Sequence, residues 1–306
     1  MFFHQGVYGI NIFIPKLFRP RRTQLSLFLT PYLLGSLLLV ALPAGISFFI
    51  AFTRYDGLSA PTFIGWKNFQ TLQLEPLFKV ALINAIIFIT QSIPLRVLGA
   101  LGLALLLNNP KRGTSLYRAA VVLPTVIPDV AYALTWTWIL NPLYGPLNAS
   151  LRTLGLFAPP WLSDSAWSLP SLVLASLFSI GEGFILLLAG LRHIPREVQD
   201  AARVDGADRW QMFTSITLPL LAPWLALLTI RDVVLSFQNT FTPATIMTGG
   251  GPYYSTFFTT QLIYETAFER MDFGLASVMM LIVFLVTIAL VTLVYFLFEG
   301  GTFDEE

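Results

Sequence analysis

The sequence predicts an all-α, polytopic membrane protein with six transmembrane helices, and two observations support this. Only 11% of the 306 residues are charged and 55% are hydrophobic, whereas a water-soluble domain carries about 25% charged residues. Six stretches are also long and apolar enough to cross a bilayer, which takes about 20 mostly apolar residues. The 18 basic and 17 acidic side chains leave a net charge of +1, so no basic field indicates nucleic acid as a partner.

The six spans form a membrane domain, residues 25–298, between an amino-terminal tail, 1–24, and a carboxyl-terminal tail, 299–306. The first and last spans contain no charged residue, and the other four contain one or two each. The expected spans are 25–53, 80–107, 119–140, 168–190, 218–241 and 273–298. Five prolines at bilayer depth are expected to bend or interrupt these helices: Pro31, Pro43, Pro94, Pro124 and Pro128.

Basic residues in the loops predict the orientation of the chain, because cytoplasmic loops carry an excess of Lys and Arg. Eleven such residues lie in the amino-terminal tail and in the loops after the second and fourth spans, and five lie on the opposite side. Both termini are therefore predicted to be cytoplasmic. The apolar and aromatic residues of the amino-terminal tail leave two alternatives, a segment along the membrane surface or a disordered tail.

Several kinds of chemistry are excluded or disfavoured. None of the four lysines follows a glycine, so the chain lacks a phosphate-binding loop of the Gly-Lys-Ser/Thr kind. The glycine-rich run 248–252 has no lysine and is expected to be a turn-rich loop. The two histidines, His4 and His193, lie in predicted cytoplasmic segments, which disfavours an intramembrane hydrolase or zinc protease. With no cysteine either, we expect no catalytic residue and no metal site.

The loop between the fourth and fifth spans, residues 191–217, is predicted to form a helix–turn–helix on the inner face of the membrane. Pro195 suits the first position of a helix and Glu197 suits its first turn. Gly206 suits the turn that ends this helix, and a second short helix is expected over 208–215. From these features alone, an ordinary connecting loop remains the alternative.

Part of this loop resembles the EAA motif of binding-protein-dependent ABC importer permeases. The elements are Asp200-Ala201-Ala202, then three residues, Gly206, nine residues and Ile216-Thr217-Leu218-Pro219. The family usually has glutamate where this chain has Asp200, so the acid is kept but is one methylene shorter. Other stretches are similar to signatures of the carbohydrate, maltose-type permeases: 63–69, 161–164, 236–238 and 248–252.

The resemblance covers nearly the whole chain and implies the type I ABC importer permease fold. In such proteins the EAA loop forms a coupling helix that sits in a groove of the ATPase subunit. The resemblance assigns Asp200, Ala201, Ala202 and Gly206 to this contact. The predicted ATPase-coupling residues also include their neighbours Glu197, Arg203 and Asp205.

The resemblance also implies partners and a setting. The partners would be a homologous second permease in a heterodimer, two copies of an ABC ATPase that bind ATP and Mg²⁺, and an extracytoplasmic solute-binding protein. The chain itself would hold no cofactor. It would lie in the prokaryotic plasma (inner) membrane among lipids and move a di- or oligosaccharide by alternating access.

Candidates for substrate contact are polar residues inside the spans, because such groups usually face the bundle or a cavity. In the fifth span Asp232, Ser236 and Asn239 share one helical stripe. Aromatic faces suit sugar rings, although all these groups could instead bond neighbouring helices. The predicted substrate path comprises Asn84, Gln91, Trp136, Arg231, Asp232, Phe237, Gln238 and Asn239.

Four alternatives remain at this point. The cargo could be a glycerol-phosphate-type solute rather than a sugar. The chain could be a proton-coupled secondary transporter that uses Asp129, Glu182 and Asp232 as proton carriers. It could also be an intramembrane enzyme, which the histidine count disfavours, or a scaffold or receptor, which leaves the EAA spacing unexplained.

Overall fold

The computed structural model describes residues 21–299, and the tail residues 1–20 and 300–306 lie outside the described part of the chain. Helices dominate, as predicted, and the one sheet among the described residues is a two-stranded antiparallel hairpin. Its strands, β1 (Thr53–Arg54) and β2 (Thr62–Phe63), pair Thr53 with Phe63. The chain divides into two units, residues 1–49 and 50–306.

The described part of the first unit is one helical stretch formed by α1 (Arg21–Ser36), the π-helical turn η1 (Leu37–Ala41) and α2 (Leu42–Ile50). Residues 28–50 are long and apolar enough to cross a membrane. The predicted span to residue 53 is three residues too long, because Thr53 already belongs to β1. The π-helical turn ends two residues before Pro43. Proline has no backbone N–H and would interrupt a regular α-helix, and the wider turn lets the helix continue past it.

The second unit begins with a loop that is held in place by side-chain hydrogen bonds from Asn68. The side-chain amide of Asn68, in α3 (Lys67–Gln73), donates to the carbonyls of Ala51 and Thr53 at 2.9 and 2.8 Å. The long helix α4 (Pro76–Leu107) follows and continues through Pro94. It begins four residues before the predicted span, with Pro76 at its first position, where a proline costs no hydrogen bond.

The third and fourth predicted spans are broken helices. α5 (Thr114–Val122) and the 3₁₀ turn η2 (Leu123–Val126) meet α6 (Asp129–Ile139) at a bend of 102°. The expected interruption by Pro124 and Pro128 is therefore confirmed. After the short helix α7 (Pro146–Thr153), α8 (Ser165–Ser176) and α9 (Gly181–His193) meet at 47°.

The predicted total of six spans holds when each bent pair counts as one span. Four helices among the described residues are long and apolar enough without a break, and the two bent pairs supply the others.

The predicted short helix 208–215 is wrong in one respect, because it does not end before the fifth span. α10 (Arg196–Val204) is followed by α11 (Arg209–Met212), which runs through the π-helical turn η3 (Phe213–Thr217) directly into α12 (Leu218–Asn239). Pro219 again stands two residues after a π-helical turn, so the turn absorbs the missing N–H and the helix continues.

The chain ends in a helical hairpin. α13 (Phe241–Pro243) and the π-helical turn η4 (Ala244–Thr248) lead into the glycine-rich run, which is the expected turn: Gly249 and Gly250 have φ of 60° and 81°. α14 (Thr259–Tyr264), the π-helical turn η5 (Glu265–Glu269) and α15 (Phe273–Glu299) follow.

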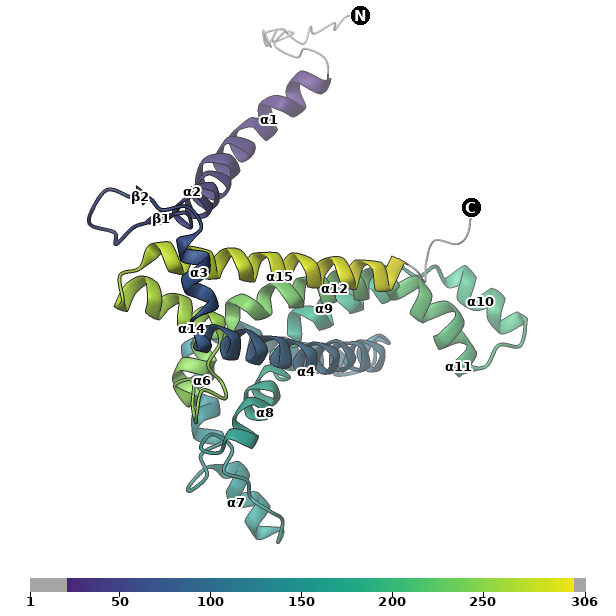
Figure 1. Cartoon of the computed structure of the whole chain (residues 1–306). Helices are drawn as coiled ribbons and strands as arrows, with labels where there is room; N and C mark the ends of the chain where they lie inside the picture. The colour runs from purple at the N-terminus through teal and green to yellow at the C-terminus, as the bar shows by residue number, and fades with distance from the viewer. Residues whose placement is uncertain (1–20, 300–306) are drawn as a thin grey trace, which may run out of the picture. The chain divides into compact units, whose positions relative to one another are not determined.

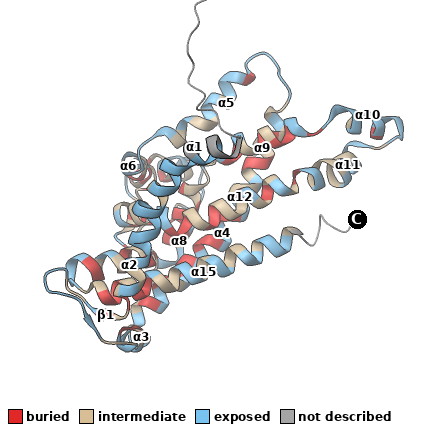
Figure 2. Cartoon of the chain, turned by 90° about the horizontal axis from the view of Figure 1, so that it is seen from above, coloured by how far each residue is buried: buried red, intermediate tan, exposed pale blue. Residues whose placement is uncertain are grey.

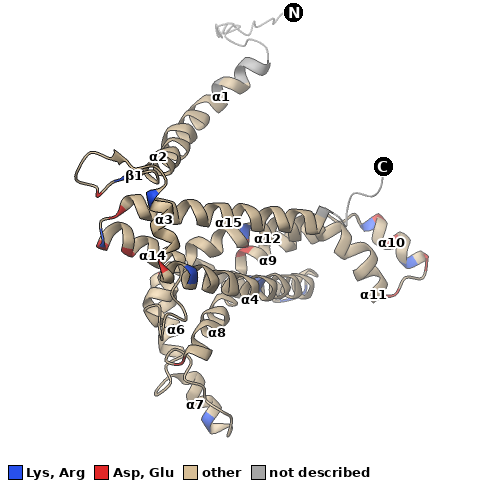
Figure 3. Ribbon diagram, viewed as in Figure 1, with Lys and Arg blue, Asp and Glu red and all other residues tan. Residues whose placement is uncertain are grey.

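Packing within the second unit is organised around α4 and α12. α4 packs against α9 and α12, and α12 packs against α15 (Figure 1). Buried residues gather on α4, α8, α9, α12 and the start of α15, whereas α10 is mostly exposed (Figure 2). Most charged side chains lie on short helices and loops such as α3, α7 and α10, and a few lie within the bundle beside α9 and α12 (Figure 3).

One end carries a cluster around Arg270, which lies between η5 and α15. Its Nη2 is 2.8 Å from Glu265 Oε1, and its Nη1 is 3.6 Å from Glu75, just before α4. The hydrogen bond to Glu265 raises the pKa of the Arg270 guanidinium. The cluster therefore connects the α14–α15 hairpin to the start of α4.

Close approach at Gly181 holds α9 against the α5 segment. A Cβ at this position would stand 2.8 Å from Val122 Cα and 2.9 Å from the Val121 carbonyl oxygen, which are backbone atoms and cannot rotate away. Only glycine lets these two segments come so close.

We predict that Gly181→Ala lowers the free energy of unfolding by about 1–3 kcal/mol, since a methyl group must be inserted into a filled site. The apparent melting temperature of the detergent-solubilised protein measures this. Gly102→Ala in α4 is the matched control, because nothing lies within 4 Å of its Cβ. It should be neutral or stabilising, and an equal loss at both positions would contradict the packing argument.

Candidate functional site

A polar cavity lies among α4, α6, α8 and α12. Its volume is about 130 Å³. Charged residues from two elements line it, Arg96 on α4 and Asp129 on α6. The other polar side chains on its wall are Tyr132, Ser176, Ser179, Ser236, Asn239 and Thr240. The rest of the wall is apolar and is formed by Phe88, Leu172, Ala175, Leu235, Pro243, Met247 and Phe258.

Both helix breaks reach this cavity. Asp129 is the first residue of α6, directly after Pro128 at the 102° bend. Ser179 lies in the break between α8 and α9. Non-helical backbone at membrane depth is tolerated where it is buried in protein or lines a cavity. The breaks therefore explain why polar groups gather here.

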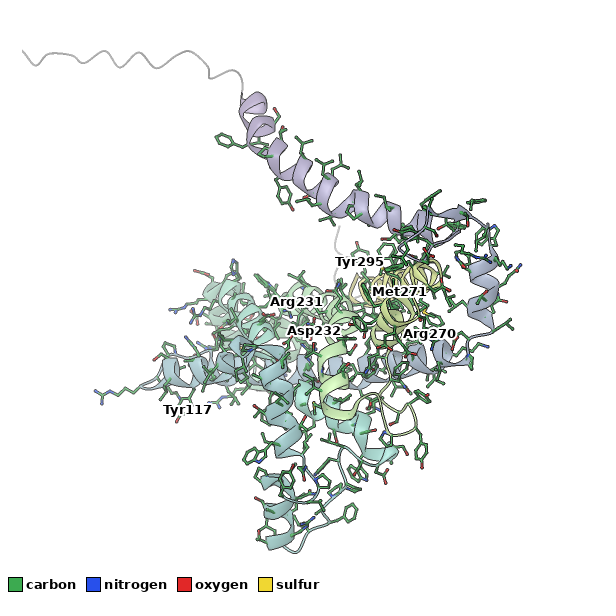
Figure 4. The ribbon with its side chains drawn as sticks, turned by 90° about the vertical axis from the view of Figure 1, so that its left-hand side faces the viewer. Tyr117, Arg231, Asp232, Arg270, Met271 and Tyr295 are labelled. Atoms are coloured by element: carbon green, nitrogen blue, oxygen red, sulfur yellow. The ribbon has the colours of Figure 1, made fainter. Side chains whose placement is uncertain are left out.

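A chain of ionic contacts passes beside the cavity. Asp232 is 2% exposed, and its carboxylate lies 3.5 Å from Arg96 Nη2 and 3.1 Å from Arg231 Nη1. Arg231 also pairs with Glu182 at the start of α9. Arg231 and Asp232 lie side by side on α12 (Figure 4). The four side chains connect α4, α9 and α12, and their two positive and two negative charges cancel.

Unused hydrogen-bonding groups remain at the cavity. Among residues 21–299, Ser236 Oγ and Arg96 Nε are buried side-chain atoms without a hydrogen-bond partner. Such groups are costly unless something completes them. Tyr132 differs, because its hydroxyl already donates to the Ala175 carbonyl at 2.7 Å. Tyr132 is also one of the residues that line the cavity.

The structure brings only part of the predicted substrate path to this cavity. Asn239 lines it, next to Ser236. Arg231 and Asp232 lie in the ionic chain instead, beside a much smaller pocket. Phe237 and Gln238, on the other side of α12, line an apolar groove of about 800 Å³ between α12, α14 and α15.

The remaining predicted residues occupy other surroundings. The buried Asn84 amide donates to the carbonyls of Tyr254 and Phe257 at 2.7 and 3.0 Å, which fixes the loop before α14. Gln91 is exposed on α4. Trp136 is buried in the core, with its ring against Tyr132 and Phe178. A contact of these residues with substrate stays a prediction.

Sequence reasoning did not propose the cavity residues Arg96, Tyr132, Ser176, Ser179 and Thr240. One signal could have found Arg96, because a lone cation in an otherwise apolar span needs a partner or a cavity. The serines and Tyr132 carried no such signal, since serine and tyrosine are common in transmembrane helices that have no site.

At the far end of α9, the loop of residues 191–217 has a sharply defined turn. α10 ends in two hydrogen bonds, from Ala207 N to the Ala202 carbonyl at 2.9 Å and from Gly206 N to the Arg203 carbonyl at 3.2 Å. This Schellman arrangement needs a left-handed residue, and Gly206 has φ +82°. The predicted turn at Gly206 is confirmed. Asp208 then caps α11, accepting from Gln211 N at 2.8 Å.

Most of α10 is exposed, and with α11 it projects beyond α9 and α12 (Figure 1). Of the seven residues predicted for ATPase coupling, six are exposed and Ala202 is buried. Asp200 pairs with Arg203 on the same helix at 3.1 Å. Val204 and Trp210 are 87% and 71% exposed.

Comparison with known proteins decides the family. The model of the family described as "Binding-protein-dependent transport system inner membrane component" matches residues 82–302. The chain belongs to this family. Membership makes it a transport permease and leaves the enzyme, scaffold and secondary-transporter alternatives without support.

Two relatives and one transporter of known structure illustrate the similarity. The probable ABC transporter permease protein YesP of Bacillus subtilis is 35% identical over 88% of both chains. The trehalose/maltose transport permease MalF of Thermococcus litoralis is 30% identical over 88% of this permease and 91% of its own length. Two structures of a bacterial alginate ABC transporter, one in complex with an alginate-pentasaccharide-bound periplasmic protein, match with a TM-score of 0.76 at 24% identity. They cover 90–92% of this chain and 93–96% of theirs, and share its fold.

We predict that Asp232→Ala destabilises this permease by about 3 kcal/mol, because Arg96 and part of Arg231 are left without a counter-charge at a buried site. Thermal unfolding of the purified protein measures the loss. Arg203→Ala breaks an exposed pair and should change the stability by less than about 1 kcal/mol. Similar losses of thermal stability in both variants would show that the buried ionic chain contributes no more to stability than an exposed ion pair.

Proposed function

We propose that this permease forms half of the translocation path of an ATP-driven importer and that its cargo is a carbohydrate delivered by an extracytoplasmic solute-binding protein. The observation that carries the proposal is the polar cavity at the junction of two broken helices. Polar hydroxyl and amide groups beside aromatic walls suit the hydroxyls and ring faces of sugars. The names of relatives such as MalF support the same cargo class.

The size of the cavity supports a second subunit. Ligand sites usually measure about 300–1,000 Å³, whereas this cavity measures about 130 Å³. A di- or oligosaccharide does not fit into it. In the proposed complex a homologous permease supplies the facing half of the site.

The energy source in the proposal is a separate ATPase, present in two copies, that binds ATP and Mg²⁺. α10 and the turn at Gly206 would sit in its groove, which places this loop and both chain termini in the cytoplasm. The exposure of six of the seven predicted coupling residues supports this role, because it leaves them free for a partner. The family description, which names an inner membrane component, supports a setting in a prokaryotic inner membrane.

The mechanism proposed is alternating access. α9 connects the two sites directly, since its last turn leads into α10 and its first turn holds Glu182 of the ionic chain. ATP must bind one conformation better than the other, or it shifts no population. A displacement of α10 would then reach the cavity through α9.

Purification of a tagged copy from its own cells in mild detergent tests the proposal, with every co-purifying chain identified by mass spectrometry. We expect an ABC ATPase and a second permease in near-stoichiometric amounts. A permease that purifies alone, even after crosslinking at residues 200–206, would contradict the proposal.

A variant pair tests the role of the turn. Gly206→Val forces a β-branched residue into φ +82° and should reduce ATPase co-purification about tenfold, because the strain of about 1–2 kcal/mol distorts the turn after α10. Gly155→Val is the matched control: Gly155 also has a positive φ, +70°, and nothing lies within 4 Å of either Cβ. Equal amounts of co-purified ATPase with both variants would contradict a role of the Gly206 turn in ATPase binding.

A further inference from the structure

Resting on the proposed function, we propose that the cargo of this permease is electrically neutral: a saccharide without carboxylate, sulfonate or phosphate groups. The family alone does not decide this point. One similar transporter imports alginate, an acidic polysaccharide, and another relative is named for the neutral sugars trehalose and maltose. The charges around the cavity of this chain distinguish the two classes.

Arg96 is the one cation among the residues that line the cavity, and its charge is already matched. Asp232 lies 3.5 Å from it and is buried. The second cation nearby, Arg231, contacts both Asp232 and Glu182. Two guanidinium groups thus face two carboxylates, so on this half of the proposed site residues 21–299 leave no unmatched positive charge for an anionic cargo.

An anion could use Arg96 only by displacing Asp232. The displaced carboxylate has no other site to occupy, because its side chain is 3% exposed and its neighbour Arg231 is shared with Glu182. Separating a buried pair leaves an uncompensated charge in a medium of low polarity. This arrangement therefore opposes binding of carboxylate or phosphate groups.

Asp129 adds to this selection. It is the only other charged residue on the cavity wall, and no Lys, Arg or His nitrogen of residues 21–299 lies within 4 Å of its carboxylate. A carboxylate accepts hydrogen bonds from sugar hydroxyls, whereas it repels an anionic group.

The hydrogen-bonding groups left open suit hydroxyls. Ser236 Oγ and Arg96 Nε have no partner among the described residues, and the Asn239 amide also lies on the wall. A sugar hydroxyl both donates and accepts, so it can pair with either end of the Asn239 amide on the cavity wall. Tyr132 and Phe258 offer faces for the apolar side of a sugar ring.

Depletion of solutes from the growth medium tests the inference on the complete transporter. Wild-type cells, an in-frame deletion and a complemented strain would receive a mixture of neutral sugars, including maltose, trehalose and lactose, and anionic solutes, including digalacturonate and sn-glycerol 3-phosphate. The medium would be followed by mass spectrometry, with and without ATP depletion.

Some solutes will be depleted by wild-type cells but left in the medium by the deletion strain. We expect all of these to be neutral and their uptake to require ATP. ATP-dependent uptake of an anionic solute through this permease would overturn the neutral-cargo inference and leave the proposed function standing. A deletion that changes no solute, or uptake that survives ATP depletion, would overturn the proposed function itself.

A charge-balanced variant pair tests the role of Arg96 separately. Arg96→Gln and Asp232→Asn each leave an unmatched charge and should lower uptake at least tenfold. The double variant restores neutrality and should recover several-fold more uptake than either single variant, at equal abundance in the membrane. If Arg96 instead holds an anionic cargo, the double variant stays as inactive as Arg96→Gln, which would overturn the inference.

Discussion

A bilayer supplies no water to backbone N–H and C=O groups, so a membrane-spanning chain must satisfy them internally or beside a polar cavity. This permease breaks two of its helices, at Pro124–Pro128 and again between Ser176 and Gly181. Asp129, just after the first break, and Ser179, within the second, both line one cavity. The position of the cavity, the polar residues around it and the bent path of α5 to α9 all depend on this constraint.

The ionic chain is the second consequence of the same geometry. Asp232 lies on an unbroken helix, but its partners come from α4 and, through Arg231, from the first turn of α9 just after a break. Replacing all four charges by apolar residues would not necessarily weaken the fold, since buried ion pairs gain little over good packing. Their value here is positional, because they hold the end of α9 nearest the cavity in register with α4 and α12.

Much of the architecture was predictable from the sequence, because the signals are local. Apolar length identified six spans, prolines located the break before Asp129, and Gly206 marked the turn after α10. The distribution of polar residues around α12 was not predictable. Asn239 and Gln238 are neighbours in the chain, yet one lines the polar cavity and the other an apolar groove. Asn84 was predicted to contact substrate because it is a polar residue inside a span. Its side-chain amide instead donates to carbonyls of a loop distant in the sequence, at Tyr254 and Phe257.

The two ends of α9 combine into one mechanical argument. Its carboxyl-terminal turn continues into the exposed α10, and its amino-terminal turn is packed against backbone at Gly181 and paired with Arg231 at Glu182. A helix of 13 residues fixed at the cavity end can transmit a displacement of α10 only by moving the ionic chain or the α8–α9 break. The ionic chain is neutral, so it can shift as a unit without exposing a net charge. That neutrality serves both tasks, since it lets the connection move and leaves the cavity without a free positive charge.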